Sequence, residues 1–539
     1  MNKKQWLRPL ALAVVLCAGV SGLQARTPDD QLIVGFSMNN LLTLDPAAAT
    51  GNDVVEVNVN LYDYLIELDA LVPDKILPGL AERWSVSDDG RRITFWLRDG
   101  VRFQSGHALT ADDAAWSLHR VLKLNLAMAS PWKSYGLSAQ NVEKAIRATD
   151  AHTLVIDLPV VTDPKMVLFT LATSVSAVVL DRRTVMANEK NGDMGRAWLA
   201  THSAGSGPFS LAQWRAKDTL IMNRFDGYWR GPAKMKRVVM RHMTESQTLR
   251  LMLSRGDLDL ASGLSVPDIE AMRKNPEVVV RSTQRGTMYY VAVSLKDPRY
   301  ADRRVRLAIR KLIDYEGINT TVMPDYGVPN QRPVPLGLAA TLPGPGYKLD
   351  VAGAKALLAE AGYPDGFDTT IRVLSDPPFI NIATSLQATL AQAGIRASVL
   401  SGTGNQVYGA MRERKFEILV GRGVGVEPHP HGSFRALVYN PDNSDAARLT
   451  NFQGWRTSFF SPALNQLIRK AEIERDEARQ MADYRQAQRL YDAEVGGIQP
   501  ISQMVDTVVM RREVRNYQAH PAATTRLRDV DKQHAEAGV

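Results

Sequence analysis

The chain has 539 residues, of which 45% are hydrophobic and 23% are charged, so the composition indicates a globular protein rather than a disordered one. At about 150 residues per domain, this length predicts three or four domains, which is enough for separate lobes. The formal net charge is +8, but acidic residues are interleaved with basic ones, which argues against the concentrated basic face of a nucleic-acid-binding protein.

The N-terminus has the layout of a secretory signal peptide that spans residues 1–25. Lys3, Lys4 and Arg8 precede a short apolar run, and cleavage is expected after the small residue Ala25. The apolar run is too short to cross a membrane. Removal of the signal lowers the formal net charge from +8 to +5. We therefore expect a soluble, exported mature protein.

Cys17 is the single cysteine, and it lies inside the apolar run of the predicted signal peptide. A lipid-anchor signal would place a small residue directly before the cysteine, whereas this sequence has Leu16 there. We therefore expect cleavage without lipid attachment. The mature chain would then contain neither disulfide bonds nor a reactive thiol.

Hydrophobic periodicity predicts regular elements along the mature chain. The alternation in RRITFWLR (91–98) predicts a half-buried strand. Thr110 and Asp113 have the spacing of a capping box, which predicts that a helix starts there. Residues 302–317 predict an amphipathic helix that ends at a glycine, and residues 461–496 predict one or two helices with a serine cap.

Residues 370–420 predict a β-α-β-α-β unit with parallel strands. Its strands are TIRVLS, IRASVL and FEILV, separated by helical segments. In such sheets ligands bind outside the carboxyl ends of the strands. Two loops follow strands at this edge, namely 376–379 and GRGVGVEPHPHGSF (421–434). The topology therefore makes both loops candidates for a ligand pocket.

The sequence lacks the motifs of the common hydrolases, metalloproteases and nucleotide-binding proteins. G-x-S-x-G, H-E-x-x-H and a Walker A loop do not occur, and GRGVGV lacks the third glycine of a dinucleotide-binding loop. No motif therefore supports an enzyme, and we expect no catalytic residue, no metal site of the protein's own and no cofactor. An exported hydrolase is the alternative from another class of function.

His429 and His431 are separated by one residue, and three interpretations of this pair stay open. The histidines belong to a hydrogen-bonded structural loop, contact a small ligand, or meet a metal ion that arrives within a bound chelate. Pro428 and Pro430 favour polyproline II, in which residues two apart diverge by roughly 120° and share one metal ion less readily. Only Glu427 lies nearby as a further ligand, whereas a protein-only site needs three or four.

LPGLAERWSVSDDGRRITFWLRDGVRFQSGHALTADDAAWSLHRV (77–121) resembles the signature region of the bacterial family 5 extracellular solute-binding proteins. These are the periplasmic receptors of dipeptide, oligopeptide and nickel ABC importers. Further segments that resemble the family, in chain order, are TLDP (43–46), LYDYL (61–65), 205–229, 302–314, 354–367 and 465–476. The resemblance therefore covers nearly the whole mature chain.

The resemblance implies an α/β fold, the two-lobed class II (Venus-flytrap) periplasmic binding protein with an extra subdomain on the first lobe. The expected segments are 26–60, 185–285 and 505–539 for lobe I, 61–184 for the extra subdomain, 286–504 for lobe II, and crossings near 286–295 and 499–508. A ligand that contacts both lobes favours the closed state by its differential affinity.

The function implied by the resemblance is that of a periplasmic, monomeric receptor for peptides or peptide-like molecules. It would deliver its ligand to an inner-membrane ABC permease with separate ATPase subunits, without chemistry on the ligand and without binding nucleic acid. The alternative within the same class is a non-peptide cargo, such as a nickel–histidine chelate, haem, an opine or a glycoside. An added duty toward a chemoreceptor also stays open.

One loop departs from the family pattern. Peptide-binding relatives carry a Trp and an Asp before an Asp-Pro here, and that Asp pairs with the free amino group of the peptide. In this sequence Gly421 stands at the position of the Trp and Val424 at that of the amine-binding Asp. Glu427, followed by Pro428, stands at the position of the Asp-Pro. Either Glu427 replaces the missing acid, or the ligand lacks a free amine at this position, while Arg422 suits a ligand carboxylate or phosphate. Further candidates for ligand contact, each of which could equally be a core residue, are Met38, Asn39, Tyr289, Tyr290 and Trp455.

Overall fold

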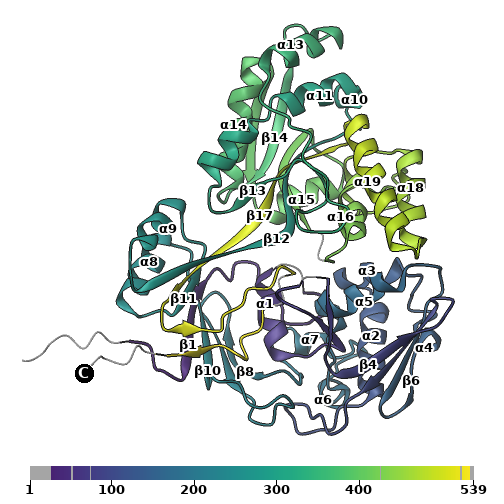
Figure 1. Cartoon of the computed structure of the whole chain (residues 1–539), viewed down its shortest axis with the longest axis vertical. Helices are drawn as coiled ribbons and strands as arrows, with labels where there is room; N and C mark the ends of the chain where they lie inside the picture. The colour runs from purple at the N-terminus through teal and green to yellow at the C-terminus, as the bar shows by residue number, and fades with distance from the viewer. Residues whose placement is uncertain (1–25, 50–51, 73, 425–426, 523–524, 534–539) are drawn as a thin grey trace, which may run out of the picture.

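The computed structural model describes residues 26–49, 52–72, 74–424, 427–522 and 525–533. Two lobes lie one above the other and are joined by two long antiparallel strands, β12 (Val278–Val293) and β17 (Ile498–Arg511) (Figure 1). These strands belong to an 11-stranded sheet that runs through both lobes in the order β15-β14-β16-β12-β17-β11-β1-β10-β9-β8, with β13 beside β17. The predicted signal peptide, with Cys17, lies outside the described residues. Within the described part, no helix combines the length and apolarity needed to span a membrane.

The lower lobe, called lobe I here, contains the end of the sheet that begins with β11. β1 pairs in parallel with both β10 and β11, whereas β9 and β8 continue the sheet in antiparallel fashion. Its elements are β1 (Gln31–Phe36), α1 (Asn52–Leu61), β8 (Phe209–Arg215), β9 (Thr219–Arg224), β10 (Arg237–His242), α8 (Ser246–Arg255), β11 (Leu260–Ser262) and α9 (Val266–Arg273). The C-terminal residues return to lobe I, where β18 (Val514–Arg515) pairs with β19 (Asp531–Lys532).

The chain between α1 and β8 adds a subdomain with its own antiparallel sheet, in the order β4-β5-β7-β6. The predicted strand and capping box are confirmed: β5 covers Arg92–Leu97, and the Thr110 N–H donates to Asp113 Oδ2 at 2.9 Å before α2. The elements of this subdomain are β2 (Ile66–Leu68), β3 (Ile76–Pro78), β4 (Ala81–Val86), β5, α2 (Ala111–Leu124), η1 (Ala127–Ala129), α3 (Ser130–Lys133), α4 (Val142–Ala145), β6 (Ile146–Asp150), β7 (Thr153–Asp157), α5 (Pro164–Thr173), η2 (Val175–Ala177), α6 (Arg182–Ala187) and α7 (Arg196–Leu199). One apolar core continues from lobe I into this subdomain.

A buried ion pair fastens the subdomain to the segment that follows β1. Arg120 of α2 is fully buried, and its guanidinium donates two hydrogen bonds of 2.7 Å to the Asp45 carboxylate. Arg120 Nε also donates to the Met194 carbonyl oxygen at 2.8 Å. Because both charges are buried away from water, removal of either partner would leave an uncompensated charge in the core and destabilise the fold.

The upper lobe, lobe II, contains the β-α-β-α-β unit, and the parallel pairing predicted for it is confirmed. β14 (Asp368–Leu374) pairs in parallel with β15 (Arg396–Gly402) and β16 (Ile418–Val424), and α14 (Phe379–Gln392) and α15 (Gly404–Arg412) connect them. The predicted loop at 421–434 is shorter than expected, because β16 continues to Val424 and α16 (Pro430–Leu437) begins at the second proline. The polyproline II prediction is wrong, since His429 is the N-cap of α16 and proline fits the first helical position.

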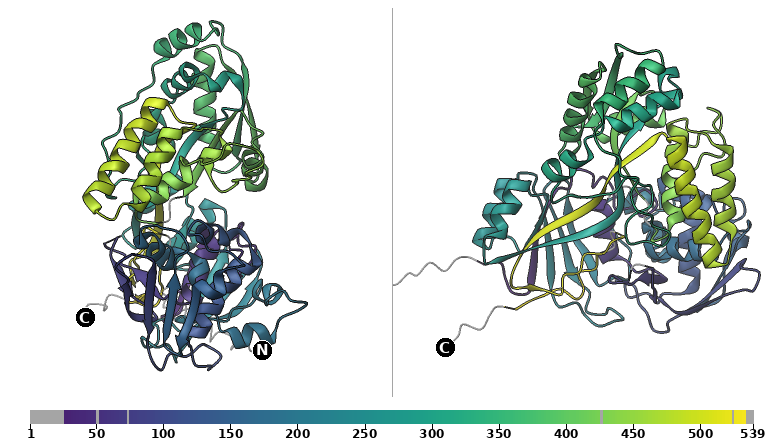
Figure 2. Two further views of the ribbon diagram at one scale, coloured as in Figure 1. Left: turned by 90° about the vertical axis from the view of Figure 1, so that its right-hand side faces the viewer. Right: turned by 45° about the horizontal axis from the view of Figure 1, so that its top comes forward.

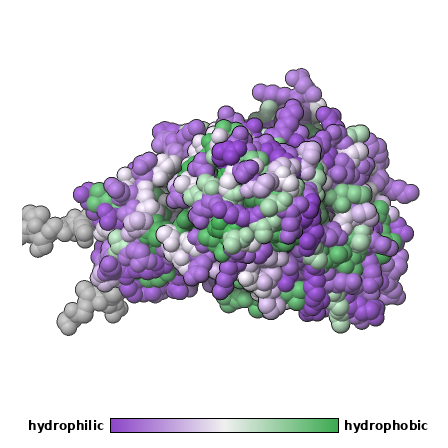
Figure 3. Space-filling model, turned by 90° about the horizontal axis from the view of Figure 1, so that it is seen from above, coloured by the Kyte–Doolittle hydropathy of each residue, from purple (hydrophilic) through white to green (hydrophobic). Residues whose placement is uncertain are grey.

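The remaining helices of lobe II pack beside this unit. The single helix predicted for 302–317 is broken, because Asp314 caps a new turn and accepts the Gly317 N–H at 2.9 Å. The remaining elements are α10 (Pro298–Ala301), α11 (Arg303–Lys311), α12 (Tyr315–Gly317), η3 (Ile318–Val322), β13 (Gly327–Pro329), α13 (Val351–Glu360), α17 (Gln453–Arg456), α18 (Pro462–Ile473) and α19 (Glu477–Glu494). Viewed from above, the surface is largely hydrophilic, with hydrophobic residues scattered over it (Figure 3).

Separate apolar cores cover the two faces of the sheet in lobe II. Alternate residues of β12 point to opposite faces, so Tyr289 belongs to the core beneath α14, whereas Tyr290 belongs to the core beneath α19. Figure 2 shows β12 and β17 passing together from one lobe to the other. The two strands therefore form both the connection between the lobes and part of the wall of each lobe.

Candidate functional site

Arg422 and Tyr289 lie side by side where lobe II approaches lobe I. They are directly opposite each other on the paired strands β16 and β12, so both side chains project from the same face of the sheet. The Phe379 ring at the start of α14 lies 5.5 Å from the Tyr289 ring and 5.8 Å from the Arg422 guanidinium carbon. Tyr289 is 2% exposed and Arg422 is half-buried. The Arg422 guanidinium and the buried Tyr289 phenol therefore lie together near the carboxyl end of β16.

The glycines beside Arg422 point to the opposite face, where space is limited. A Cβ on Gly423 would lie 2.4 Å from the Leu437 side chain, and one on Gly421 would lie 3.3 Å from the Tyr290 ring. Tyr290 is fully buried there, with its hydroxyl 3.9 Å from Met411 Sδ. The glycine-rich sequence therefore accommodates the packing around Tyr290, and Tyr290 lies on the other face from Arg422.

His429 and His431 are turned toward α19, away from Arg422. His429 Nδ1 accepts the backbone N–H of His431 at 3.2 Å, which places the ring proton on Nε2, 3.2 Å from Gln480 Oε1. His431 Nδ1 lies 2.9 Å from the Tyr484 hydroxyl, and its Nε2 lies 3.7 Å from a Glu472 carboxylate oxygen. Both histidines are buried, and burial lowers the pKa of each to about 3. Both rings are therefore neutral at physiological pH.

A shared metal site is not formed by these histidines. Among the described residues, no group of three or more His, Cys, Asp or Glu side chains is placed to hold a metal ion. Glu427 instead extends along α16, where a Cβ on Gly432 would lie 2.3 Å from its carboxylate oxygen. A carboxylate near the first turn of a helix is stabilised by the backbone N–H groups there.

The other candidate residues lie at separate places. Trp455 is buried beneath the Arg414 guanidinium, and its indole N–H donates to the Ser444 carbonyl oxygen at 2.9 Å. Met38 is buried at the carboxyl end of β1, and its N–H donates to His242 Nδ1 at 2.9 Å. Asn39 is exposed beside it. Val424 ends β16 opposite Thr287, and its side chain lies outside the described part of the chain.

Two acidic residues of α1 were missed in the sequence analysis. Asp53 and Glu56 are three residues apart and share one face of the helix, which lies at the top of lobe I beneath lobe II (Figure 1). Asp53 Oδ2 accepts the Asn40 N–H at 3.3 Å. Burial raises the pKa of Asp53, while Arg422 of the other lobe acts in the opposite direction. The available signal was a pair of acids at helical spacing in a segment that is otherwise made of valine, asparagine and leucine.

Glu56 lies next to the strands that cross between the lobes. Burial raises the pKa of Glu56 to about 7. The positive charge of Arg285 acts to lower this pKa, and the negative charges of Asp506 and Asp53 act to raise it further. Arg285 does not neutralise Glu56, because it forms an ion pair with Asp506, with Nε donating to Oδ2 at 2.5 Å. The lobes therefore approach each other with two acids on α1 and a cation on β16.

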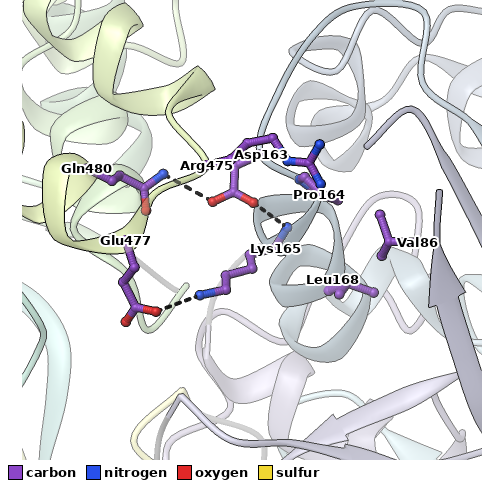
Figure 4. Close-up of a pocket in the computed structure, with 8 residues that line it drawn as sticks. All are labelled: Val86, Asp163, Pro164, Lys165, Leu168, Arg475, Glu477 and Gln480. Atoms are coloured by element: carbon purple, nitrogen blue, oxygen red, sulfur yellow. Dashed lines mark hydrogen bonds and ion pairs between the residues drawn. The ribbon is translucent and has the colours of Figure 1, made fainter. Parts of the chain in front are cut away.

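A second contact between the lobes lies far from the crossing strands, where α5 meets α18 and α19. The Gln480 amide donates to the Asp163 carboxylate at 3.1 Å, and Lys165 Nζ donates to Glu477 at 3.2 Å (Figure 4). The backbone N–H of Asp163 also donates to the Glu472 carbonyl oxygen at 3.1 Å. A pocket of roughly 200 Å³ lies at this contact. Gln480 thereby connects Asp163 of the subdomain to His429 of lobe II.

The chain is similar to known proteins over nearly its whole length. The family model for "Bacterial extracellular solute-binding proteins, family 5 Middle" matches residues 75–445. The probable D,D-dipeptide-binding periplasmic protein DdpA of Escherichia coli (strain K12) is 26% identical over 539 residues, covering 97% of this chain and 98% of DdpA.

Solved structures share the two-lobed α/β fold, as the sequence resemblance implied. The ABC transporter-associated periplasmic binding protein DppA from Helicobacter pylori, in complex with the peptide STSA, has a TM-score of 0.80 at 23% identity, covering 94% of this chain and 98% of that one. MoaA from A. tumefaciens R10, in complex with mannopinic acid, has a TM-score of 0.80 at 21% identity, covering 94% and 100%. Because the family model matches more than half of the chain, the protein belongs to the bacterial extracellular solute-binding proteins, family 5.

Proposed function

We propose that this protein is the periplasmic receptor of an ABC importer and that it captures a peptide between its two lobes. The observation that supports the proposal is that Arg422 of lobe II lies near enough to Asp53 of lobe I for its charge to act against the rise in the pKa of that carboxyl group. Arg422 lies near the carboxyl end of β16, and Asp53 lies in α1, the helix that follows β1; the carboxyl ends of parallel strands are where open α/β sheets bind ligands. A molecule held there contacts both lobes at once.

Capture depends on the two strands that connect the lobes. Local irregularities in the pairing of β12 and β17, between Gln284 and Met288 and again between Tyr289 and Tyr290, give the connection places to bend. A ligand that contacts both lobes stabilises the closed state by its differential affinity for that state. The contact between α5 and α19 then forms as part of closure. The closed receptor releases its ligand unchanged to an inner-membrane permease served by ATPase subunits.

Peptides are the preferred ligand class because of the relatives. DdpA is named as a probable D,D-dipeptide-binding protein, and the DppA structure contains the peptide STSA. The test is to purify the protein natively from the periplasm and to identify the retained ligand by mass spectrometry. Thermal shifts with libraries of di- and tripeptides, including D,D-dipeptides, then measure binding. If no peptide is retained and none raises the melting temperature, the proposal is wrong.

A second candidate is the same receptor class with a non-peptide cargo. It is favoured by Val424, which occupies the position at which peptide-binding relatives carry the acid that pairs with the ligand's amino group. The similar fold of MoaA with mannopinic acid supports it further. Thermal shifts with nickel plus free histidine, haem and mannopinic acid test this candidate beside the peptide libraries. A shift with one of these compounds and none with peptides would replace the first proposal by the second.

Export and partners follow from the same proposal. Residues 1–25 act as a cleaved signal peptide, so the mature protein begins at Arg26 and is recovered from the periplasmic fraction. N-terminal sequencing of the exported protein tests the cleavage position. Copurification with an inner-membrane permease tests the partner. An exported protein that retained its first 25 residues would contradict the cleaved signal.

A further inference from the structure

Three buried polar side chains form a continuous chain of hydrogen bonds across the contact between α5 of the subdomain and α19 of lobe II. The Asp163 carboxylate, which caps α5, accepts the Gln480 amide of α19 at 3.1 Å (Figure 4). Gln480 Oε1 in turn lies 3.2 Å from His429 Nε2. All three residues are buried, so this chain of hydrogen bonds lies away from water while the two sides are in contact.

His429 is covered by the subdomain as well as by its own lobe. The Phe169 ring of α5 lies 6.1 Å from the His429 ring, and the Tyr484 ring of α19 lies 5.6 Å from it. Phe169 belongs to the subdomain, whereas His429 and Tyr484 belong to lobe II. Separation of the two sides would therefore remove Phe169 and Asp163 from this environment and admit water to the imidazole.

The hydrogen bonds of His429 require a neutral ring. Nδ1 accepts the His431 N–H at the start of α16, so the ring proton is on Nε2, which faces Gln480. A second proton, on Nδ1, would remove this acceptor and place a positive charge at the N-terminus of a helix, which the helix dipole disfavours. Burial accordingly lowers the pKa of His429 to about 3, whereas a hydrated imidazole has a pKa of about 6.5.

The charges around His429 offset one another, so burial decides its protonation. Lys165 acts to lower the pKa of His429 and Glu477 acts to raise it, but these two side chains are exposed and pair with each other at 3.2 Å. The polar groups that surround the ring are Asp163, through Gln480, and Lys165 on the subdomain side, Glu477, Gln480 and Tyr484 of α19, and His431 of α16.

We propose that Asp163, Gln480 and His429 form a proton-sensitive latch, which keeps a measurable fraction of ligand-free molecules closed at neutral pH and is released when His429 takes up a proton. This inference rests on the proposed receptor function, because the lobes must be able to separate, and it adds a control of closure by pH. The closed form is favoured above pH 6.5 and loses this advantage as the pH falls, since only the open form hydrates the ring and binds the proton.

The size of the effect follows from the protonation of a hydrated imidazole. At pH 7.5 about one-tenth of such rings are protonated, and at pH 5.5 about nine-tenths are. The ratio of open to closed molecules is therefore expected to rise about tenfold between these two pH values.

The test measures the distance across the contact at both pH values. Protein produced from Arg26 onward contains no cysteine, so Asp112→Cys on α2 and Gln486→Cys on α19 each introduce a single labelling position at an exposed residue. Pulsed electron paramagnetic resonance of the doubly spin-labelled protein, before and after removal of retained ligand, gives the populations of short and long distances. The ligand-free protein is expected to show a closed population at pH 7.5 and an open-to-closed ratio about tenfold higher at pH 5.5.

Variants in the labelled protein then assign the response to His429. His429→Asn keeps an oxygen acceptor at the N-cap of α16 but does not titrate in this range, so its open-to-closed ratio is expected to be the same at both pH values. His431→Gln is the matched control, because His431 is equally buried but faces Tyr484 and Glu472 within lobe II. It is expected to keep the tenfold response. The comparison of the two pH values without either substitution does not depend on the folding of these variants.

The outcomes separate this inference from the proposed function. If the distance is the same with and without retained ligand and at both pH values, the lobes do not separate, and the receptor function is wrong together with the latch. If the distance changes on ligand removal, only the latch is overturned by any of three results: a ligand-free protein that is entirely open at pH 7.5, a ratio that does not depend on pH, or a His429→Asn variant that keeps the full pH response.

Discussion

The buried histidines of lobe II predict that the protein loses stability as the pH falls below 6.5. Burial holds the pKa of His429 and of His431 at about 3, whereas a histidine in the unfolded chain has its ordinary value of 6.5. Between these values the unfolded chain takes up protons that the folded protein cannot bind. The stabilisation is therefore complete above pH 6.5 and declines as the pH falls toward 3.

The magnitude follows from the two pKa values. At pH 5.0 an unfolded histidine of pKa 6.5 is almost fully protonated, and this favours the unfolded state by about 2 kcal/mol per histidine relative to pH 7.5. The groups that face His431 are Glu472, Tyr484, Arg435 and Arg469, and the two arginines oppose protonation in the fold. Both histidines together predict a loss of about 4 kcal/mol.

The assay is urea unfolding at pH 7.5 and pH 5.0, followed by tryptophan fluorescence. His431→Gln keeps a neutral hydrogen-bonding group opposite Tyr484, and it is expected to lose about 2 kcal/mol less than wild type between the two pH values. Any constant cost of the substitution cancels in this comparison. His202→Gln, at an exposed histidine, is the control and should follow wild type. Equal losses in wild type and His431→Gln would refute the reasoning.

Three further predictions concern single side chains. Glu56→Gln is expected to raise the free energy of unfolding by about 3 kcal/mol at pH 8, because it removes a carboxylate whose pKa is raised to about 7 from the ordinary 4.5. In urea unfolding this gain in stability should disappear near pH 4, below the pKa that Glu56 has in the unfolded chain. A gain that stays the same at both pH values would contradict the prediction. Asp45→Asn should destabilise the fold by about 3–5 kcal/mol, since Arg120 stays buried without its carboxylate, and a thermal melt that matches wild type would rule this out. Gln480→Ala removes the link to Asp163, so small-angle scattering should show a larger radius of gyration for the ligand-free variant, and an unchanged radius would disprove the role of this contact.

Much of the local structure could be predicted from short stretches of sequence. The capping box at Thr110 and Asp113 and the parallel unit that ends in β16 depend on residues close to one another in the chain. Such patterns act over a few residues, so they remain visible without the fold. The break after Lys311 was missed because Asp314 can either continue a helix or cap a new turn, and periodicity does not distinguish the two.

The face to which each candidate residue points was decided by the tertiary structure. Successive side chains of a strand point to opposite faces of the sheet, so the pairing register between β12 and β16 decides which face each residue occupies. Arg422 lies on the face of Phe379, and Gly421 and Gly423 lie on the face of Tyr290. The sequence by itself determined the family, the order of the elements and the edge of the sheet at which to look. Only packing between segments far apart in the chain brought α1 to β16 and turned the two histidines toward α19, because those contacts depend on the shape of the whole core.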